Sequence, residues 1–296
     1  MVVSARRATL SAPSGPRAEP VGVRCHPVPV AHTRPTDPAA LLDAALRRTP
    51  AAPLLTQYDD ASGERVELSA TTLANWVAKT ANLLQDEFDV TAGSTVAVAL
   101  PVHWQTAAVL LAVWSCGATV LDTAAEDDGR LAGADVVLAA QDRLAPLEEQ
   151  DLPELLGLSL HPLGTGMTGY AGPARDFAVE VRAHGDVFVP WQPPDPAAPG
   201  LRLGGLELTL GGLVDTAREL AGRLGVAAGD RVLVDERTAA EAGPVAWLLA
   251  PLAAGASIVL VRSPDPARLP RRAADERVTA TLGRTIEGIR ELGRPA

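Results

Sequence analysis

A repeated pattern constrains the fold of this chain more than any other feature of its sequence. Residues 67–84 and 207–224 begin alike, with Glu-Leu-Ser and Glu-Leu-Thr, and space their apolar residues alike at an offset of 140. Two further pairs of segments match after a shorter loop, at offsets of 136 and 138: 90–98 with 226–234, and 117–120 with 255–258. The alternative is a chance likeness between units rich in Ala and Leu. Because the glycines and helix starts coincide as well as the apolar positions, two related halves are favoured.

Each half alternates amphipathic stretches with short apolar runs. Asp37 is expected to cap a helix over 38–48, and Ser69 a second helix with its apolar face at Leu73, Val77, Ala81 and Leu84. Residues 54–68 have the pattern of a hairpin around an Asp-Asp-Ala-Ser-Gly turn. Strands are expected at 96–100 and 118–121 with a helix between them, which indicates βα units and a largely parallel sheet.

These patterns predict an α/β protein of two similar subdomains, with mainly parallel sheets flanked by helices. Four segments are expected: a disordered extension over 1–34, a first subdomain over 35–185, a second over 186–262, and a C-terminal segment over 263–296 that completes the sheet.

Charge and composition exclude several functional classes. The 296 residues carry a net charge of −10, which argues against nucleic acid or an anionic membrane as the main partner. Residues 1–34 and 262–296 are basic, so the body between them is strongly acidic. Cys25 and Cys116 form no CxxC pattern, the N-terminus has no apolar signal-peptide core, and residues 245–261 form an interrupted apolar run typical of a buried helix and strand. We therefore expect a cytoplasmic protein.

Several stretches resemble the N-terminal region of the adenylate-forming enzymes, the superfamily of acyl- and aryl-CoA synthetases, luciferases and peptide-synthetase adenylation domains. The likeness spans roughly 38–285 and rests on 67–84, 90–98, 208–232, 251–260 and 276–282. The last of these resembles a strand. The resemblance implies the two-subdomain body of that superfamily without its small C-terminal lid, and is strongest to a group of actinobacterial proteins with the same shortened layout.

The chemistry of that superfamily is not matched. Its phosphate loop reads (S/T)-G-(S/T)-(S/T)-G-x-P-K-G, whose backbone N–H groups and lysine hold ATP phosphates. Aligned on Leu208-Thr209, the last Gly falls on Gly205, the Lys on Gly204 and the Pro on Leu203. The preceding segment contains Asp195 and five prolines, at 190, 193, 194, 196 and 199, each without a backbone donor. Arg202 would be a replacement charge, but the loop itself is expected to be lost.

Other catalytic groups are missing as well. The aromatic–His stretch of the superfamily corresponds to residues 235–238, Asp-Glu-Arg-Thr, and the given sequence ends at Ala296, ahead of the later motifs and the lid lysine. Lys79 is the single lysine and is expected on an outer helix. Self-contained adenylation is therefore not expected. We assign no catalytic residue, no metal ligand and no cofactor, and leave any ligand-binding residues open.

Some motifs invite other interpretations. Residues 164–169 fit G-x-G-x-x-G, but Tyr-Ala-Gly-Pro follows where a dinucleotide site needs a helix, so a surface loop is favoured. His103 follows a predicted strand, where it is either a ligand-binding residue or, as we favour, the cap of the next helix. The histidines at 26, 32, 103, 161 and 184 lack metal-ligand spacing, and Cys116 is expected to be buried.

Two surface features remain. The acidic runs 126–128 and 148–151 are expected to be solvated faces in preference to metal sites. Trp191, among prolines, either docks on a partner or packs back onto the body.

The leading functional hypothesis is a non-catalytic relative of these enzymes that binds a small ligand or a protein partner. One alternative is a partial AMP-forming acyl ligase completed by a second chain. Another is a structural module that self-associates through an exposed apolar surface.

Overall fold

The computed structural model describes residues 35–122 and 130–293, so the extension predicted over 1–34 and the acidic run 126–128 lie outside the described residues. Local capping places the first helices where the sequence predicts them. The Asp37 carboxylate accepts a hydrogen bond from Ala40 N at the start of α1, and Ser69 Oγ accepts one from Thr72 N at the start of α2.

The described helices and strands alternate along the chain, with two longer connections, 159–174 and 184–198, that contain neither. The helices are α1 (Pro38–Arg48), α2 (Ala70–Phe88), α3 (Trp104–Ser115), η1 (Arg130–Gly133), η2 (Gln141–Arg143), α4 (Leu144–Glu148), α5 (Phe177–Glu180), η3 (Val181–Ala183), α6 (Leu210–Leu224), α7 (Glu236–Pro244), the π-helix η4 (Val245–Leu249), α8 (Ala250–Ala254) and α9 (Leu269–Asp275). The strands are β1 (Pro53–Asp59), β2 (Glu64–Ser69), β3 (Thr95–Ala99), β4 (Thr119–Asp122), β5 (Val136–Ala140), β6 (Leu155–Leu158), β7 (Arg175–Asp176), β8 (Pro199–Leu203), β9 (Leu206–Thr209), β10 (Arg231–Asp235), β11 (Ser257–Arg262), β12 (Ala280–Leu282) and β13 (Arg290–Glu291).

The strands form two mainly parallel sheets. Sheet A has the order β13-β12-β10-β11-β1-β2, and sheet B has the order β7-β6-β5-β3-β4-β8-β9. Among the strands of residues 35–122 and 130–293, only β2 and β9, the second strands of the two hairpins, run antiparallel to their neighbours. This α/β architecture with parallel sheets and flanking helices confirms the predicted fold class.

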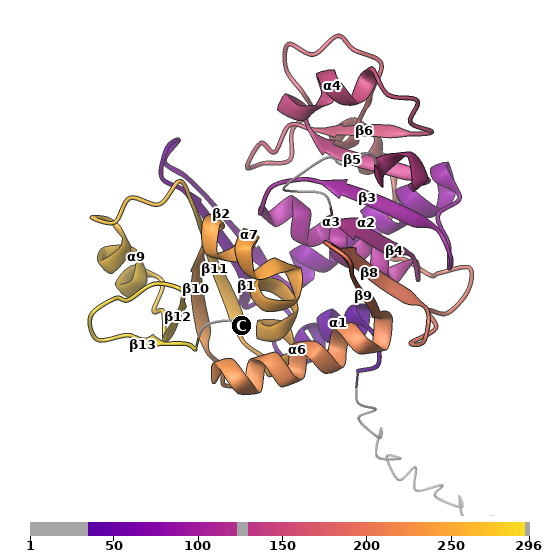
Figure 1. Cartoon of the computed structure of the whole chain (residues 1–296). Coiled ribbons are helices and arrows are strands. Elements are labelled where there is room, and N and C mark those ends of the chain that lie inside the picture. The colour runs from indigo at the N-terminus through magenta and orange to yellow at the C-terminus, as the bar shows by residue number, and fades with distance from the viewer. Residues whose placement is uncertain (1–34, 123–129, 294–296) are drawn as a thin grey trace, which may run out of the picture. The chain divides into compact units, whose positions relative to one another are not determined.

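The two hairpins each belong to the sheet of the other half. The β1–β2 hairpin precedes α2 and β3 in the chain but pairs with β11, and the β8–β9 hairpin precedes α6 and β10 but pairs with β4. Figure 1 shows β1 and β2 beside β11, and β8 and β9 beside β4. The division between the sheets therefore does not follow the boundary expected at residues 185–186, because each sheet is completed by a hairpin from across that boundary.

Three apolar clusters fill the layers between and outside the sheets. The main cluster joins one face of each sheet to α1, α2, α3, α6, η4 and α8, so these helices pack between the sheets. A second cluster lies on the other face of sheet B, against η1 and α4. A third lies on the other face of sheet A, against α9. Burial of such continuous Val, Leu and Ala surface is the main favourable term in the folding free energy.

Candidate functional site

The β8–β9 hairpin occupies the place where the superfamily has its phosphate loop. The nine positions aligned with the loop motif are residues 197–205, and five of them form β8, which lies between β4 and β9 and pairs with both. Leu203 pairs with Leu206, so only Gly204 and Gly205 form the turn, with φ of 53° and 89°. Two glycines with positive φ form a tight hairpin turn of the I′ kind. The backbone donors of this segment therefore serve a sheet and leave no extended glycine-rich loop.

The charged residues of the same segment are also engaged within the protein. Arg202 Nε donates to Glu207 Oε2 across the hairpin at 2.9 Å, and Asp195 Oδ1 accepts from Ala197 N at 2.9 Å. Trp114 Nε1 donates to Gly200 O at 2.7 Å, which fixes β8 against the buried helix α3. Arg202, the one candidate for a replacement phosphate charge, is thus already paired with a carboxylate.

The carboxyl ends of the parallel strands in sheet A gather a second set of polar groups. In open α/β sheets this edge is where ligands usually bind. Asp235 ends β10 with its side chain fully buried, where it accepts from Thr238 N at 2.9 Å and from Arg284 Nε at 2.5 Å. Burial opposes ionisation of Asp235, but the helix cap and the Arg284 guanidinium outweigh it and lower the pKa of the carboxyl. Residues 235–238 therefore start α7, and Asp235 has a capping role.

Beside it lies a group that we call the Arg262 cluster, formed by Asp59, Glu236 and Arg262. Arg262 Nη1 lies 3.7 Å from Asp59 Oδ2, and Arg262 Nε lies 3.5 Å from Glu236 Oε2. The Nε atom is buried and makes no hydrogen bond within the described part of the chain. Both carboxylates also accept backbone hydrogen bonds, from Ala61 N at 2.9 Å and from Ser263 N at 2.8 Å, so the cluster is held together within the protein. Sequence reasoning missed it, although charged residues at the ends of two predicted strands were the available signal.

His103 lies close enough to this cluster to be affected by its charge. Its Nδ1 accepts from Gln105 N at 3.2 Å at the start of α3, which confirms the predicted helix cap. Burial, and secondarily the Arg262 cation, lower the pKa of His103 to about 3, so the imidazole is neutral near pH 7. A neutral imidazole whose Nδ1 is an acceptor is not available there as a base.

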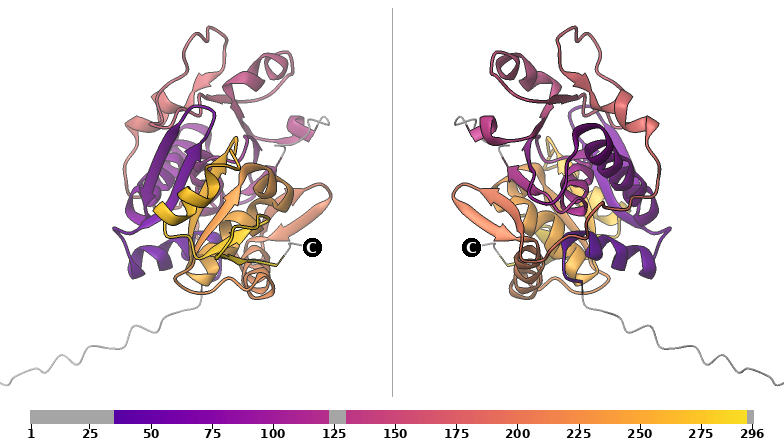
Figure 2. Two further views of the ribbon diagram at one scale, coloured as in Figure 1. Left: turned by 90° about the vertical axis from the view of Figure 1, so that its left-hand side faces the viewer. Right: turned by 90° about the vertical axis from the view of Figure 1, so that its right-hand side faces the viewer.

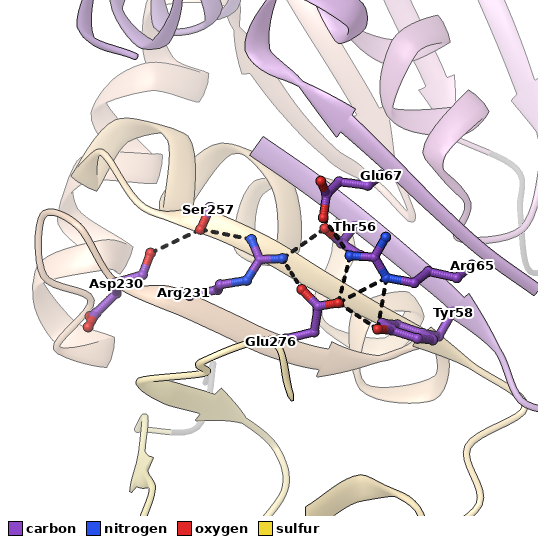
Figure 3. Close-up of polar contacts among 8 residues, drawn as sticks. All are labelled: Thr56, Tyr58, Arg65, Glu67, Asp230, Arg231, Ser257 and Glu276. Atoms are coloured by element: carbon purple, nitrogen blue, oxygen red, sulfur yellow. Dashed lines mark hydrogen bonds and ion pairs between the residues drawn. The ribbon is translucent and has the colours of Figure 1, made fainter. Parts of the chain in front are cut away.

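A third polar group joins sheet A to the end of α9 (Figure 3). Glu276 Oε1 accepts from Tyr58 Oη at 2.5 Å and from Arg65 Nη2 at 2.8 Å, while Oε2 accepts from Arg231. The Glu276 side chain is 7% exposed. Burial alone would raise its pKa, but these hydrogen bonds and cations lower it to about 2.

This Glu276 network is structural in character. Arg65 also reaches Glu67 at 2.5 Å, and Arg231 also donates to Thr56 Oγ1 at 2.8 Å, so every charge is met by a partner in β1, β2 or β10. The resemblance indicated a strand from Glu276 to Leu282, whereas residue 276 is the C-cap that follows α9 and the strand starts at Ala280. Residue 276 is not in the strand because its carboxylate is held at the end of α9 by side chains more than 40 residues away in sequence.

The remaining candidates from the sequence fall outside any shared site. Residues 164–169 form a loop between β6 and β7, as predicted. Cys116 is 2% exposed and its pKa is raised to about 12 by burial, which confirms the predicted buried thiol. Lys79 is on α2, which packs between the sheets and is not the outer helix expected, and it bonds to His184 O at 2.5 Å and Asp186 at 3.0 Å. Within 35–122 and 130–293, no group of three His, Cys, Asp or Glu side chains could hold a metal ion.

Comparison with solved structures defines the class of fold. The chain is similar to the N-terminal domain of FACL13 from Mycobacterium tuberculosis, with a TM-score of 0.63 and 14% identity over 83% of this chain and 62% of that one. It is similar to an acyl-CoA synthetase of Brucella canis, with a TM-score of 0.66 and 18% identity over 83% of this chain and 47% of that one. It is also similar to the anthranilate CoA ligase AuaEII in complex with anthranoyl-AMP. The TM-score is 0.63 and the identity is 16%, over 84% of this chain and 50% of that one. The fold is that of the N-terminal body of adenylate-forming enzymes, and the chain spans about half the length of these proteins.

Sequence comparison then gives the family. A protein of Mycobacterium tuberculosis (strain ATCC 25618 / H37Rv), described as a TIGR03089 family protein, is 47% identical over 251 residues, which are 82% of this chain and 96% of that protein. This chain belongs to the TIGR03089 family. A scan against protein-family models gave no match. Among the described residues, no helix has the length and apolar character needed to cross a membrane.

Proposed function

We propose that this protein is a non-catalytic binding protein built on the body of an adenylate-forming enzyme. The observation that carries the proposal is the β8–β9 hairpin, in which a two-glycine turn stands at the place of the phosphate loop. The proposal includes a reducing, cytoplasmic setting, which the absence of a cysteine pairing pattern supports.

The physical reason concerns the donors that polyphosphate requires. A phosphate loop works because several adjacent N–H groups point at the anion from a segment that forms no sheet. Here residues 199–203 form the penultimate strand of sheet B, paired with β4 and β9, and the Arg202 guanidinium is paired with Glu207. Removing a preorganised set of donors costs most of the stabilisation of a charged transition state.

The rival proposal, a partial acyl ligase completed by a second chain, is weaker for the same reason. A second chain can bring a lysine, but it cannot supply backbone donors to a segment that is already a strand. AuaEII was solved with anthranoyl-AMP, which makes acyl adenylates the natural probes for any surviving site.

The test is ATP–pyrophosphate exchange by the purified protein with Mg²⁺ and a panel of aliphatic and aromatic carboxylic acids. We expect no exchange above the background without protein, whereas the Brucella canis acyl-CoA synthetase assayed in parallel serves as the active control. Exchange that falls in an Arg202→Ala variant would overturn the proposal, because a contaminating enzyme would be indifferent to that substitution. Exchange that arises only on mixing with a second purified chain would establish the rival.

A further inference from the structure

The segment after η3 forms an extended strap along α2 that turns apolar side chains toward solvent. Val187, Val189 and Trp191 alternate along this strap, and they are 79%, 72% and 57% exposed. Phe188, between the first two, packs against the main core cluster. Figure 2 shows the salmon-coloured chain between η3 and β8 passing along the outside of the body.

Three polar side chains of α2 hold the strap in this orientation. They recur at spacings of three residues, at Lys79, Asn82 and Gln85, so they share one face of the helix. Their donors reach four carbonyls of the strap, at His184 (2.5 Å), Gly185 (3.0 Å), Val187 (3.0 Å) and Val189 (3.3 Å), and Trp191 N donates back to Gln85 Oε1 at 2.9 Å.

This arrangement fixes which way the strap faces. With the carbonyls of residues 187 and 189 bonded to α2, rotation of the strap that would bury its apolar side chains breaks those hydrogen bonds. The apolar stripe is therefore preorganised, which lowers the entropic cost of binding a partner. Exposed apolar side chains that are grouped, and not scattered, mark interaction surfaces.

The charge around the stripe selects the partner. Residues 79–89 and 184–195 carry five carboxylates, at Asp86, Glu87, Asp89, Asp186 and Asp195, and one lysine. Arg175 lies 3.6 Å from Glu87 and 3.0 Å from Glu180, so with this pair included six negative charges against two positive ones leave −4. A stripe of this charge repels an acidic segment and attracts a basic one.

We propose that the stripe of Val187, Val189 and Trp191 binds a basic, apolar segment of a partner protein. Apolar side chains of that segment cover the valines, and an Arg or Lys lies on the Trp191 ring as a cation–π contact within the acidic rim. The stripe is about 13 Å long at the rise of an extended chain, which suits a segment of about five extended residues. The inference deepens the proposed binding function by naming its surface and its partner chemistry.

The test is selection of peptides from a random dodecapeptide display library on the immobilised protein, followed by fluorescence anisotropy with the synthetic peptides. We expect the selected peptides to be basic and apolar. We expect Trp191→Ala to lower the affinity of the protein for these peptides at least about tenfold. Asp89→Asn, at a left-handed helix cap that Asn tolerates, should lower this affinity about two- to threefold. Leu206→Ala, which truncates an apolar residue of matched exposure (51%) on the β8–β9 hairpin, should leave the affinity unchanged.

Three results overturn the inference: no peptide is selected, the selected peptides are acidic, or their affinity survives Trp191→Ala in a variant with an unchanged melting temperature. A dimer seen by light scattering that Trp191→Ala dissociates would assign the stripe to a second copy. None of these results bears on pyrophosphate exchange, so failure here and failure of the non-catalytic proposal are distinguishable.

Discussion

Replacing Glu276 with Gln removes the charge at the centre of the network that attaches the end of α9 to sheet A. The folded-state pKa of about 2 lies below the ordinary value of 4.5, so the ionised carboxylate stabilises the folded state. At 1.36 kcal/mol for each pH unit, this shift is equivalent to about 3 kcal/mol near neutral pH. Because the folded pKa is lowered, that contribution is complete above about pH 5.5 and is lost as the pH falls from 4.5 toward 2.

The assay is urea unfolding of wild type and Glu276→Gln at pH 7.0, 5.5 and 3.5. We expect the variant to be about 2–3 kcal/mol less stable at pH 7, since Gln keeps part of the hydrogen bonding. Between pH 5.5 and 3.5 the wild type should lose about 1.4 kcal/mol more than the variant, which is the linkage expected for pKa values of 4.5 and about 2.

The control is Glu67→Gln, which removes a carboxylate that is 36% exposed and touches the same Arg65. An exposed pair of this kind contributes less than about 1 kcal/mol. Parallel pH profiles for wild type and Glu276→Gln would refute the reasoning, because they would mean that the carboxylate titrates alike in the folded and unfolded states.

Three further predictions concern single positions. His103→Ala should lower the free energy of unfolding in urea by about 2 kcal/mol, because the cap of α3 is lost. His103→Asn should recover about half of that loss, and equal losses in the two variants would contradict the capping role. In a Cys25→Ser background, Cys116 should be unreactive to a thiol reagent at pH 8 and react fully in urea; rapid labelling of the native protein would show an exposed thiol. Gly205→Ala, at φ 89°, should destabilise by about 1 kcal/mol, whereas Gly222→Ala, in a helix with free space around it, should stabilise by a similar amount.

Local features of the fold were predictable from the sequence. Asp37, Ser69 and His103 cap the helices that they precede, because a capping side chain and the following apolar stripe are both visible within a few residues. The buried helix and strand over 245–261 were predicted from the length and interruptions of the apolar run.

Features that depend on distant partners were not predictable in this way. The β1–β2 hairpin has the same local pattern whichever sheet it joins, so its pairing with β11 could not be inferred from its own residues. The resemblance placed Glu276 in a strand, and its role in holding α9 could not be inferred locally because the aromatic and guanidinium groups that bind it come from β1, β2 and β10. For Trp191, the docking and packing alternatives were left open. The hydrogen bonds from α2 that hold the strap join segments about 100 residues apart, so they could not be inferred from the residues around Trp191.

The proposed non-catalytic function requires that the β8–β9 hairpin, which stands at the place of the phosphate loop, does not hold phosphates. The most direct measurement is isothermal titration calorimetry of the purified protein with Mg-ATP, repeated with AMP and a non-hydrolysable acyl adenylate. We predict no saturable heat with any of the three at millimolar ligand. Saturable binding of Mg-ATP at micromolar concentration, weakened by Arg202→Ala, would contradict the proposed function and show that this hairpin still holds phosphates.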